Sequence, residues 1–312
     1  MNTIPINDPV LIERFSSMHP DGMTIFLLGN GAMRGAFFHG TRFVNQMRAQ
    51  HQLGLLETMV LGQACLCGAL LIPTMKGHER AIFRYDTKGP AAGFSVEANS
   101  EGYVRGFLLQ DPIPVDEPPE NWDLSPYFGE GFVTVTRFPE GRTEPVIGSV
   151  EIVHRNIAKD LTEYFLRSEQ IRTAINTGIQ FDQEGRVIGA GALFLQVMPG
   201  ASLDLVEAAE HAFASAPSLG QWFAEGGDRE DIIYGLFRNC EPSAVLDREI
   251  RFYCPCSRER FEQHLQNLNR KELIDMAENG PDPIETVCHN CGSVYSYPLA
   301  EIREWLKDSD PS

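Results

Sequence analysis

The segments FYCPCSRER (residues 252–260) and CHNCG (residues 288–292) hold four of the seven cysteines of this 312-residue chain. They form a C-x-C pair and a C-x-x-C pair that are separated by 31 residues. Four thiolates in two close pairs suit tetrahedral zinc, whose Zn–S bonds are roughly 2.3 Å long. We therefore predict one zinc ion per chain, bound by Cys254, Cys256, Cys288 and Cys291.

Two other interpretations of these cysteines are weaker. Four unliganded thiols in one small domain would be unusual, because a free cysteine normally lies singly in a core. A zinc hydrolase needs an open coordination position, which four sulfurs close. His289 lies inside the second pair and is expected to be a neighbour of the metal rather than a ligand. The cysteine count is odd, and four of the seven lie close together near the C-terminus, which favours metal binding in a reducing compartment over a secreted disulfide framework.

Oxidation of the four cysteines would have a structural consequence. Zinc would tie the two pairs together across 31 residues, whereas a disulfide within a pair closes only a tiny loop. Partners two or three positions apart can reach disulfide distance where the chain bends, as Pro255 favours. A sulfenic acid on one cysteine would be trapped by its neighbour as a disulfide, and the metal would leave. Because structural zinc contributes roughly 10 to 16 kcal/mol to the folding of finger-sized units, the C-terminal unit should then unfold.

Residues 1–200 are expected to form an α+β core with a largely antiparallel sheet. Turns with hairpin chemistry lie at 99–102 and 182–185. Apolar residues at helical spacing predict helices within 41–71, with a break at Gly54, and at 156–175. The Pro-rich, acidic segment 111–126 should be an exposed loop. The β-rich runs are 24–28, 80–85, 93–98, 103–109, 132–138, 178–181 and 187–197.

Residues 201–252 are expected to form a helical linker, and residues 253–312 a zinc-binding unit. The linker carries too many large apolar residues for a solvated tether, so they must pack on something when the protein is at rest. In the C-terminal unit, Ser257 can cap one helix, and Asn269 with Glu272 starts a second helix that stops at 279–281. The apolar linker residues are Leu203, Leu205, Val206, Phe213, Trp222, Phe223, Ile232, Ile233, Leu236 and Phe237.

Composition excludes several kinds of partner. The formal net charge of -17 gives a negative surface field that repels phosphate backbones and anionic lipid, so neither nucleic acid nor a membrane is expected as a partner. Residues 1–15 have no basic and apolar leader pattern, and the apolar stretch 64–73 is too short to span a bilayer. A soluble, cytoplasmic protein is expected.

Other motifs are expected to be structural. Cys65 and Cys67 repeat the C-x-C spacing, but they stand among Leu, Ala and Ile, so buried and inert thiols are favoured over a second redox pair. Cys240 is interpreted in the same way. Gly29 to Gly35 does not match the dinucleotide fingerprint, and a tight strand connection is expected there. The eight histidines form no known catalytic array and no Walker-type loop is present, so we do not expect an enzyme.

The sequence resembles the 33-kilodalton heat-shock chaperonin family, which are oxidation-activated holdases of the bacterial cytoplasm. The resemblance extends from roughly Gly22 onward, and C-x-C-S-R-E-R followed at this distance by C-x-x-C is its most specific element. The other matching motifs are Tyr295 after the second cysteine pair, DLTEYFLRSEQ at 160–170 and LQVMPGA at 195–201.

The resemblance implies a substrate-binding core, a metastable linker and a zinc unit that senses oxidant. It also implies ATP-independent binding of unfolding client proteins in oxidative and heat stress, and a homodimer on activation. The redox disulfides would pair Cys254 with Cys256 and Cys288 with Cys291. Cys65, Cys67 and Cys240 are additional thiols that depart from the usual pattern. The alternative function is a constitutive zinc-ribbon module that binds proteins and whose metal is purely structural.

Overall fold

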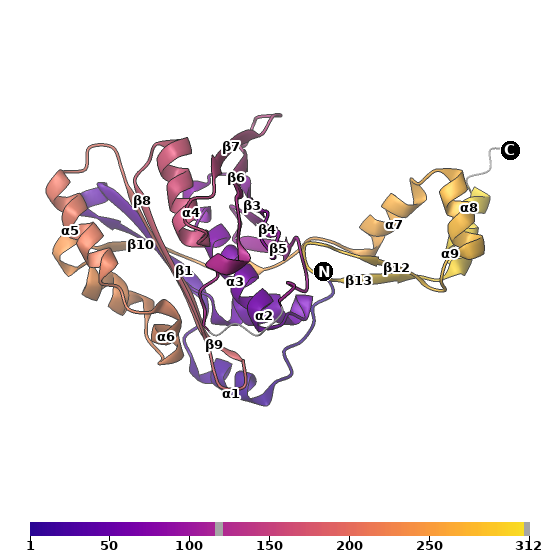
Figure 1. Ribbon diagram of the computed structural model, residues 1–312, viewed down its shortest axis with the longest axis horizontal. Coiled ribbons are helices and arrows are strands. Elements are labelled where there is room, and N and C mark those ends of the chain that lie inside the picture. The colour runs from indigo at the N-terminus through magenta and orange to yellow at the C-terminus, as the bar shows by residue number, and fades with distance from the viewer. Residues whose placement is uncertain (116–120, 309–312) are drawn as a thin grey trace.

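The computed structural model describes residues 1–115 and 121–308, and its core consists of two mainly antiparallel sheets (Figure 1). The first sheet has the order β10 (Ser243–Arg248), β1 (Gly22–Leu28), β2 (Met33–His39), β9 (Val187–Val197) and β8 (Thr173–Phe181). The second has the order β11 (Arg251–Phe252), β5 (Tyr103–Leu108), β4 (Gly93–Asn99), β3 (Arg80–Thr87), β6 (Gly131–Phe138) and β7 (Val146–Glu151), and only β11 pairs in parallel there. The predicted α+β fold and its antiparallel hairpins are confirmed.

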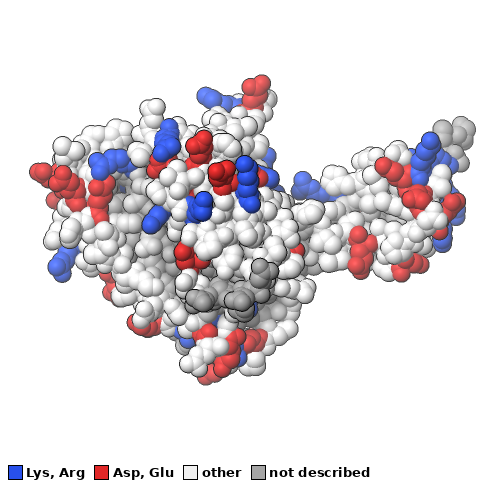
Figure 2. Space-filling model, in the orientation of Figure 1, with Lys and Arg blue, Asp and Glu red and all other residues white. Residues whose placement is uncertain are grey.

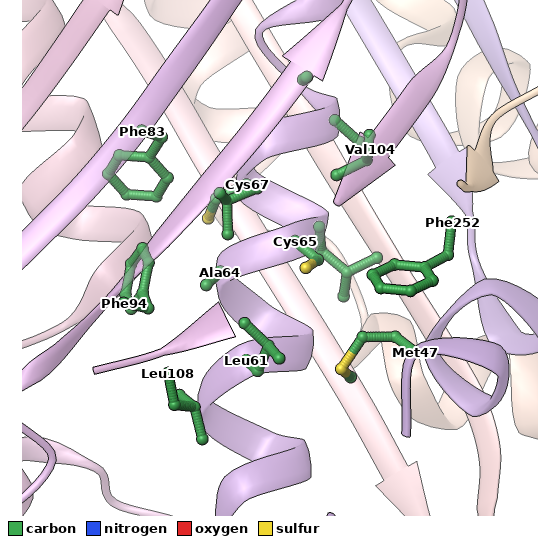
Figure 3. Packing of buried hydrophobic residues seen from close by; sticks show 14 of the residues in the cluster. Met47, Leu61, Ala64, Cys65, Cys67, Phe83, Phe94, Val104, Leu108 and Phe252 are labelled. Carbon is green, nitrogen blue, oxygen red and sulfur yellow. The ribbon is translucent and has the colours of Figure 1, made fainter. Parts of the chain in front are cut away.

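Helix α3 (Leu55–Ala69) lies in the core and packs against both sheets. It is apolar on nearly every side, as expected of a helix with no solvent-facing surface. Figure 3 shows its side chains among residues of the second sheet such as Phe83 and Val104. The stretch Leu55–Thr74 is long and apolar enough to cross a membrane by composition, but 89% of its most apolar window is buried in the fold. Its composition is therefore explained by the core.

Helix α2 (Thr41–His51) precedes α3 and is separated from it by a sharp break. Gln52 takes the left-handed conformation, with φ of 56°, and ends α2. Gly54 then stands at the N-cap of α3, so the predicted break at Gly54 is confirmed. Ahead of both, α1 (Pro9–Ser17) is capped by the Asp8 carboxylate, which accepts from the Val10 and Leu11 amides.

The first sheet is apolar on both faces because both faces are covered. Successive side chains of a strand point to opposite faces, so Phe38 joins the main core while Phe37 joins a second cluster on the other side. The linker helices α5 (Leu203–Ala214) and α6 (Leu219–Ala224), with the π-helical turn Asp231–Leu236, cover that second face. The expectation that the apolar linker residues pack on something is confirmed for all of them except Leu203, which is 71% exposed because it lies at the first position of α5.

The C-terminal unit projects from the side of the core opposite the linker helices (Figure 1). Its helices are α7 (Arg258–Gln266), α8 (Arg270–Asn279) and α9 (Leu299–Asp308), and its hairpin is β12 (Ile284–Val287) with β13 (Val294–Tyr297). The predicted Ser257 cap and the Asn269–Glu272 capping box are both present. On the face shown in Figure 2, acidic and basic side chains are interspersed over core and C-terminal unit.

Three expectations need correction or restriction. The helix expected at 156–175 is α4 (Ile157–Tyr164) followed by a π-helical turn, because Gln170 takes the left-handed conformation and β8 begins at Thr173. The linker is helical only to Cys240, since β10 and β11 occupy its last part as edge strands of the two sheets. In the expected loop 111–126, residues 116–120 lie outside the described residues, and the rest contains only a short 3-10 turn at its end.

Candidate metal centre

The four C-terminal cysteines meet at the joint between the core and the C-terminal unit. Cys254 and Cys256 follow β11, which is paired to the core strand β5, and Cys288 and Cys291 lie in the turn of the β12–β13 hairpin. The turn is tight, because the Cys288 carbonyl accepts from the amides of both Cys291 (3.2 Å) and Gly292 (2.7 Å). The fold therefore brings together two cysteine pairs that are 31 residues apart in the chain.

Glycine at position 292 is required by backbone geometry and by the core. Its φ is +66°, a conformation that favours glycine, and a Cβ there would lie 2.6 Å from the Gln50 carbonyl oxygen at the end of α2. Ser293 extends this contact, because its hydroxyl accepts from the Asn2 amide (3.1 Å) and from the Gln50 side-chain amide (3.3 Å). The second cysteine pair thus rests against the core through its turn.

The positions of the sulfurs fit a tetrahedral metal. All four Sγ atoms lie within 4.8 Å of one another, and the four side chains are buried. The Cys254 and Cys288 sulfurs are 3.8 Å apart, and those of Cys256 and Cys291 are 3.4 Å apart. Zn–S bonds of roughly 2.3 Å in a tetrahedron require sulfurs about 3.8 Å apart, whereas a disulfide would bring them to about 2.05 Å. The cluster has the donor set and spacing of a closed, reduced zinc site.

Local hydrogen bonds separate the acidities of these thiols in the metal-free cluster. The pKa of Cys254 is lowered, because the Cys288 and Cys291 thiols donate to its sulfur and the Arg105 guanidinium does so as well. The pKa of Cys288 is raised, chiefly because its proton is held by Cys254. The same acceptor raises the pKa of Cys291 to about 11. In the protonated cluster, hydrogen bonds from the neighbouring groups stabilise one thiolate. A metal that displaces the protons would bind four thiolates instead.

Groups from three segments surround the sulfurs. The Arg105 Nη1 atom on β5 lies 3.1 Å from the Cys254 sulfur, and the Tyr295 hydroxyl on β13 lies 3.2 Å from the Cys256 sulfur. The N-terminal ammonium of Met1 donates to the carbonyls of Cys254 (3.1 Å) and Cys256 (2.8 Å). The core strand β5 and the N-terminal segment are therefore part of the surroundings of the centre.

Comparison with known proteins places this arrangement in a family. The family model described as Hsp33 protein matches residues 21–298. The chain belongs to the Hsp33 family. Two relatives described as 33 kDa chaperonin come from Ruminiclostridium cellulolyticum, 31% identical over 89% of this chain and 95% of that protein, and from Desulforamulus reducens, 30% identical over 86% and 90%. The crystal structure of the 33 kDa chaperonin from Thermotoga maritima has a TM-score of 0.84 at 28% identity, over 93% of this chain and 99% of that one.

The other cysteines lie away from the centre. Among the described residues, the four C-terminal cysteines form the single group of three or more His, Cys, Asp or Glu side chains that is spaced to hold a metal. His289 is not in that group, and its ring lies 5.9 Å from Phe107. Cys65, Cys67 and Cys240 are buried in apolar clusters, as expected for structural thiols. Gly29 to Gly31 form a 3-10 turn between β1 and β2, which confirms the predicted strand connection.

Sequence reasoning missed the neighbours of this centre that come from the core. Arg105 lies 149 positions before Cys254, and no spacing rule links the two. The contact arises because β11 pairs with β5 in the register Phe252 to Val104, so that Cys254, two residues further on, lies within reach of the Arg105 side chain. A predicted parallel pairing between 251–252 and 103–104 would have been the only signal in the sequence.

Proposed function

We propose that this Hsp33-family chain is a redox-regulated, ATP-independent holdase chaperone without enzymatic activity. In the reduced state one Zn²⁺ would be held by Cys254, Cys256, Cys288 and Cys291. The bound metal would cross-link the segment after β11 to the turn of the β12–β13 hairpin. The single observation that carries the proposal is that the segment ending at Cys254 is continuous with the linker that covers an apolar face of the first sheet. The joint is therefore covalently connected to the linker, so unfolding of the joint would act directly on the element that covers this apolar surface.

The oxidative step balances within each cysteine pair. Two thiolates lose two electrons and form one S–S bond, while the O–O bond of a peroxide breaks and the oxygens leave, with two protons taken up, as two waters. We propose the pairings Cys254 with Cys256 and Cys288 with Cys291. Disulfide sulfurs are poor zinc ligands, so this step would release the metal and remove the bridge between the two pairs.

The covered face offers a large apolar surface for client proteins. Phe223 of α6 stacks on Phe37 at 5.3 Å between ring centroids, and Phe237 lies 5.5 Å from Phe26. Fully burying each such ring stabilises docking by about 1.5 to 3 kcal/mol. Once the linker leaves, these rings on sheet and linker alike could bind unfolding chains, as exposed apolar patches do.

The same interface contains groups that weaken it. Burial raises the pKa of Asp21 to about 6 and lowers that of His39, which stacks on Phe223, to about 3. Asp21 Oδ1 and Arg229 Nη1 are buried and, among the described residues, have no hydrogen-bond partner. Such groups cost free energy when water is excluded. They support the proposal that the docked linker is metastable.

A light-scattering assay tests this function. A thermally aggregating client protein is heated with the reduced, zinc-loaded chain or with the peroxide-treated chain, without ATP. We expect suppression of aggregation by the oxidised chain and little by the reduced chain, and equal activity of both would exclude a redox switch.

Light scattering or sedimentation of the oxidised chain would also test the proposed homodimer. A cytoplasmic location and a role in oxidative and heat stress complete the proposal.

A constitutive zinc-ribbon module is the second candidate, because the closed four-sulfur shell is also typical of purely structural zinc. In that case the metal would be retained during peroxide treatment with warming. Zinc retention with an unchanged thiol count would favour this candidate.

A further inference from the structure

Three charged side chains form a row across the second sheet, and the row ends at the Cys254 sulfur of the metal centre. They are Arg80, Glu97 and Arg105. Arg80 on β3 donates to Glu97 on β4 (Nη1 to Oε2, 3.2 Å), and Arg105 on β5 donates to the other oxygen of the same carboxylate (Nη2 to Oε1, 2.9 Å). The register pairs Glu97 directly with Arg105. The second terminal nitrogen of Arg105, Nη1, then lies 3.1 Å from the Cys254 sulfur. The row thus connects a core strand to a sulfur of the candidate zinc site.

The two arginines of the row differ in their contacts and in their exposure. Both bind Glu97, but only Arg105 reaches a sulfur, and its side chain is 19% exposed against 42% for Arg80. A site of one Zn²⁺ and four thiolates carries a net charge of −2, and a hydrogen bond from a cation to a thiolate is stronger in a partly buried site than in water. Arg105 is therefore placed to offset charge that the metal leaves uncompensated.

We propose that Arg105 is a positioning residue of the redox centre, which holds the reduced Cys254 thiolate against the edge of the core sheet. The inference rests on the proposed zinc-thiolate function and adds a residue of the core to it. Neighbours of a metal site that orient its ligands typically change metal affinity by 10- to 100-fold when they are removed. Arg105 acts through Cys254 and does not itself bind the metal.

The contact depends on the charge state of the sulfur. When Cys254 and Cys256 give two electrons to a peroxide and form a disulfide, the Cys254 sulfur loses its negative charge and its charge-assisted hydrogen bond. Among the described residues, the Arg105 guanidinium then keeps Glu97 as its charged partner. The backbone hydrogen bonds that remain there include those from Arg251 to Gly102 (2.9 Å), from Tyr253 to Val104 (3.0 Å) and from Gly106 to Asn290 (3.2 Å). Oxidation of the first cysteine pair therefore weakens the attachment of β11 to β5.

Zinc competition under reducing conditions tests the role of Arg105 without any redox step. Full-length, zinc-loaded chains are titrated with a chromogenic chelator. R105Q should bind zinc about 10- to 100-fold more weakly than the wild-type chain. R105K keeps the charge and should restore at least part of this loss. The matched controls are R80Q, which breaks one ion pair of the row, and E97Q, which breaks both. Neither removes the donor to sulfur, and both should bind zinc within about twofold of wild type.

Amide hydrogen exchange gives a second readout that does not depend on metal affinity. In the zinc-saturated wild-type chain, the amides of residues 103–107 and 251–253 should be protected from exchange. Their protection factors should fall about tenfold in R105Q and stay unchanged in R80Q. Wild-type zinc affinity and protection in R105Q would overturn the inference. An equal loss of zinc affinity and protection in E97Q would also overturn it, because the ion pair with Glu97, and not the contact with sulfur, would then account for the effect of R105Q.

The two proposals fail in different ways. Should peroxide leave the wild-type chain inactive as a chaperone while R105Q still loses zinc affinity, the redox function fails and the role of Arg105 stands. Should peroxide activate the wild-type chain while R105Q retains wild-type affinity and protection, only the role of Arg105 fails.

Discussion

The chain contains two C-x-C pairs with opposite environments. Cys65 and Cys67 lie on one helix, α3, and are fully buried among apolar side chains (Figure 3). Burial raises the pKa of both thiols far above the usual range. Cys254 and Cys256 follow an edge strand, face a second pair of cysteines, and have Arg105 beside them.

The difference shows that the same C-x-C spacing can place cysteines in quite different surroundings. A thiol reacts as its thiolate, and a thiolate needs a metal, a cation or a hydrogen-bond donor nearby. The pair on α3 has apolar neighbours and therefore serves packing, whereas the pair after β11 has the Cys288 and Cys291 thiols and the Arg105 guanidinium beside it. The predictions below separate these two roles, beginning with the largest expected effect.

Replacing one ligand should abolish the metal site. Cys288→Ser should reduce zinc content from one per chain to none, because a hydroxyl is a poor zinc ligand, and the C-terminal unit should unfold with the loss of about 10 to 16 kcal/mol of apparent folding free energy. Metal analysis and limited proteolysis measure both effects. The matched control, Cys67→Ala, should keep one zinc per chain. Zinc in Cys288→Ser at wild-type stoichiometry would contradict the assigned ligand set.

Loosening the linker should bypass cysteine chemistry. Phe223→Ala removes a buried ring that stacks on Phe37 and His39, which should destabilise the docked linker by about 3 to 5 kcal/mol. The reduced, zinc-loaded variant should then suppress client aggregation without peroxide. Exposed Trp122→Ala serves as a matched aromatic control. A reduced Phe223→Ala chain that stays inactive while its linker is open to proteases would show that the covered face does not bind clients.

Zinc affinity should rise steeply with pH. The pKa values of Cys288 and Cys291 are raised in the metal-free cluster, so both thiols keep their protons at neutral pH and zinc must displace them. Each displaced proton makes the affinity rise about tenfold per pH unit, so these two thiols alone give a rise of about 100-fold per unit between pH 6 and 8. Competition titrations measure the slope, and a Cys65→Ala, Cys67→Ala chain should give the same value. A flat profile would mean that these two thiols are already ionised.

Removing a core thiol should have a small effect that is confined to stability. Cys67→Ala leaves a small cavity between α3 and the second sheet and should cost about 1 to 2 kcal/mol in free energy of unfolding. Denaturant titration of the core measures it. Chaperone activation by peroxide should be unchanged. A variant that can no longer be activated would give the pair on α3 a redox role and remove the contrast between the two pairs.

Much of the fold could be predicted because its strands alternate and its turns carry Gly and Asx residues. The pairing of 93–99 with 103–108 and the break at Gly54 follow from local chemistry. The helix ending after Tyr164 and the strands β10 and β11 could not be predicted, since they depend on a left-handed Gln170 and on pairing with distant strands. The sulfur cluster followed from cysteine spacing, but Arg105 did not, because its place depends on a parallel register between residues about 150 positions apart.

The most direct test is a peroxide titration in which released zinc and free thiols are counted on the same sample. One zinc should be released as four thiols disappear, and three thiols, those of Cys65, Cys67 and Cys240, should remain. Peptide mapping should join Cys254 to Cys256 and Cys288 to Cys291. Retention of zinc after the four thiols are lost, or oxidation of Cys65 and Cys67 ahead of the C-terminal four, would contradict the account.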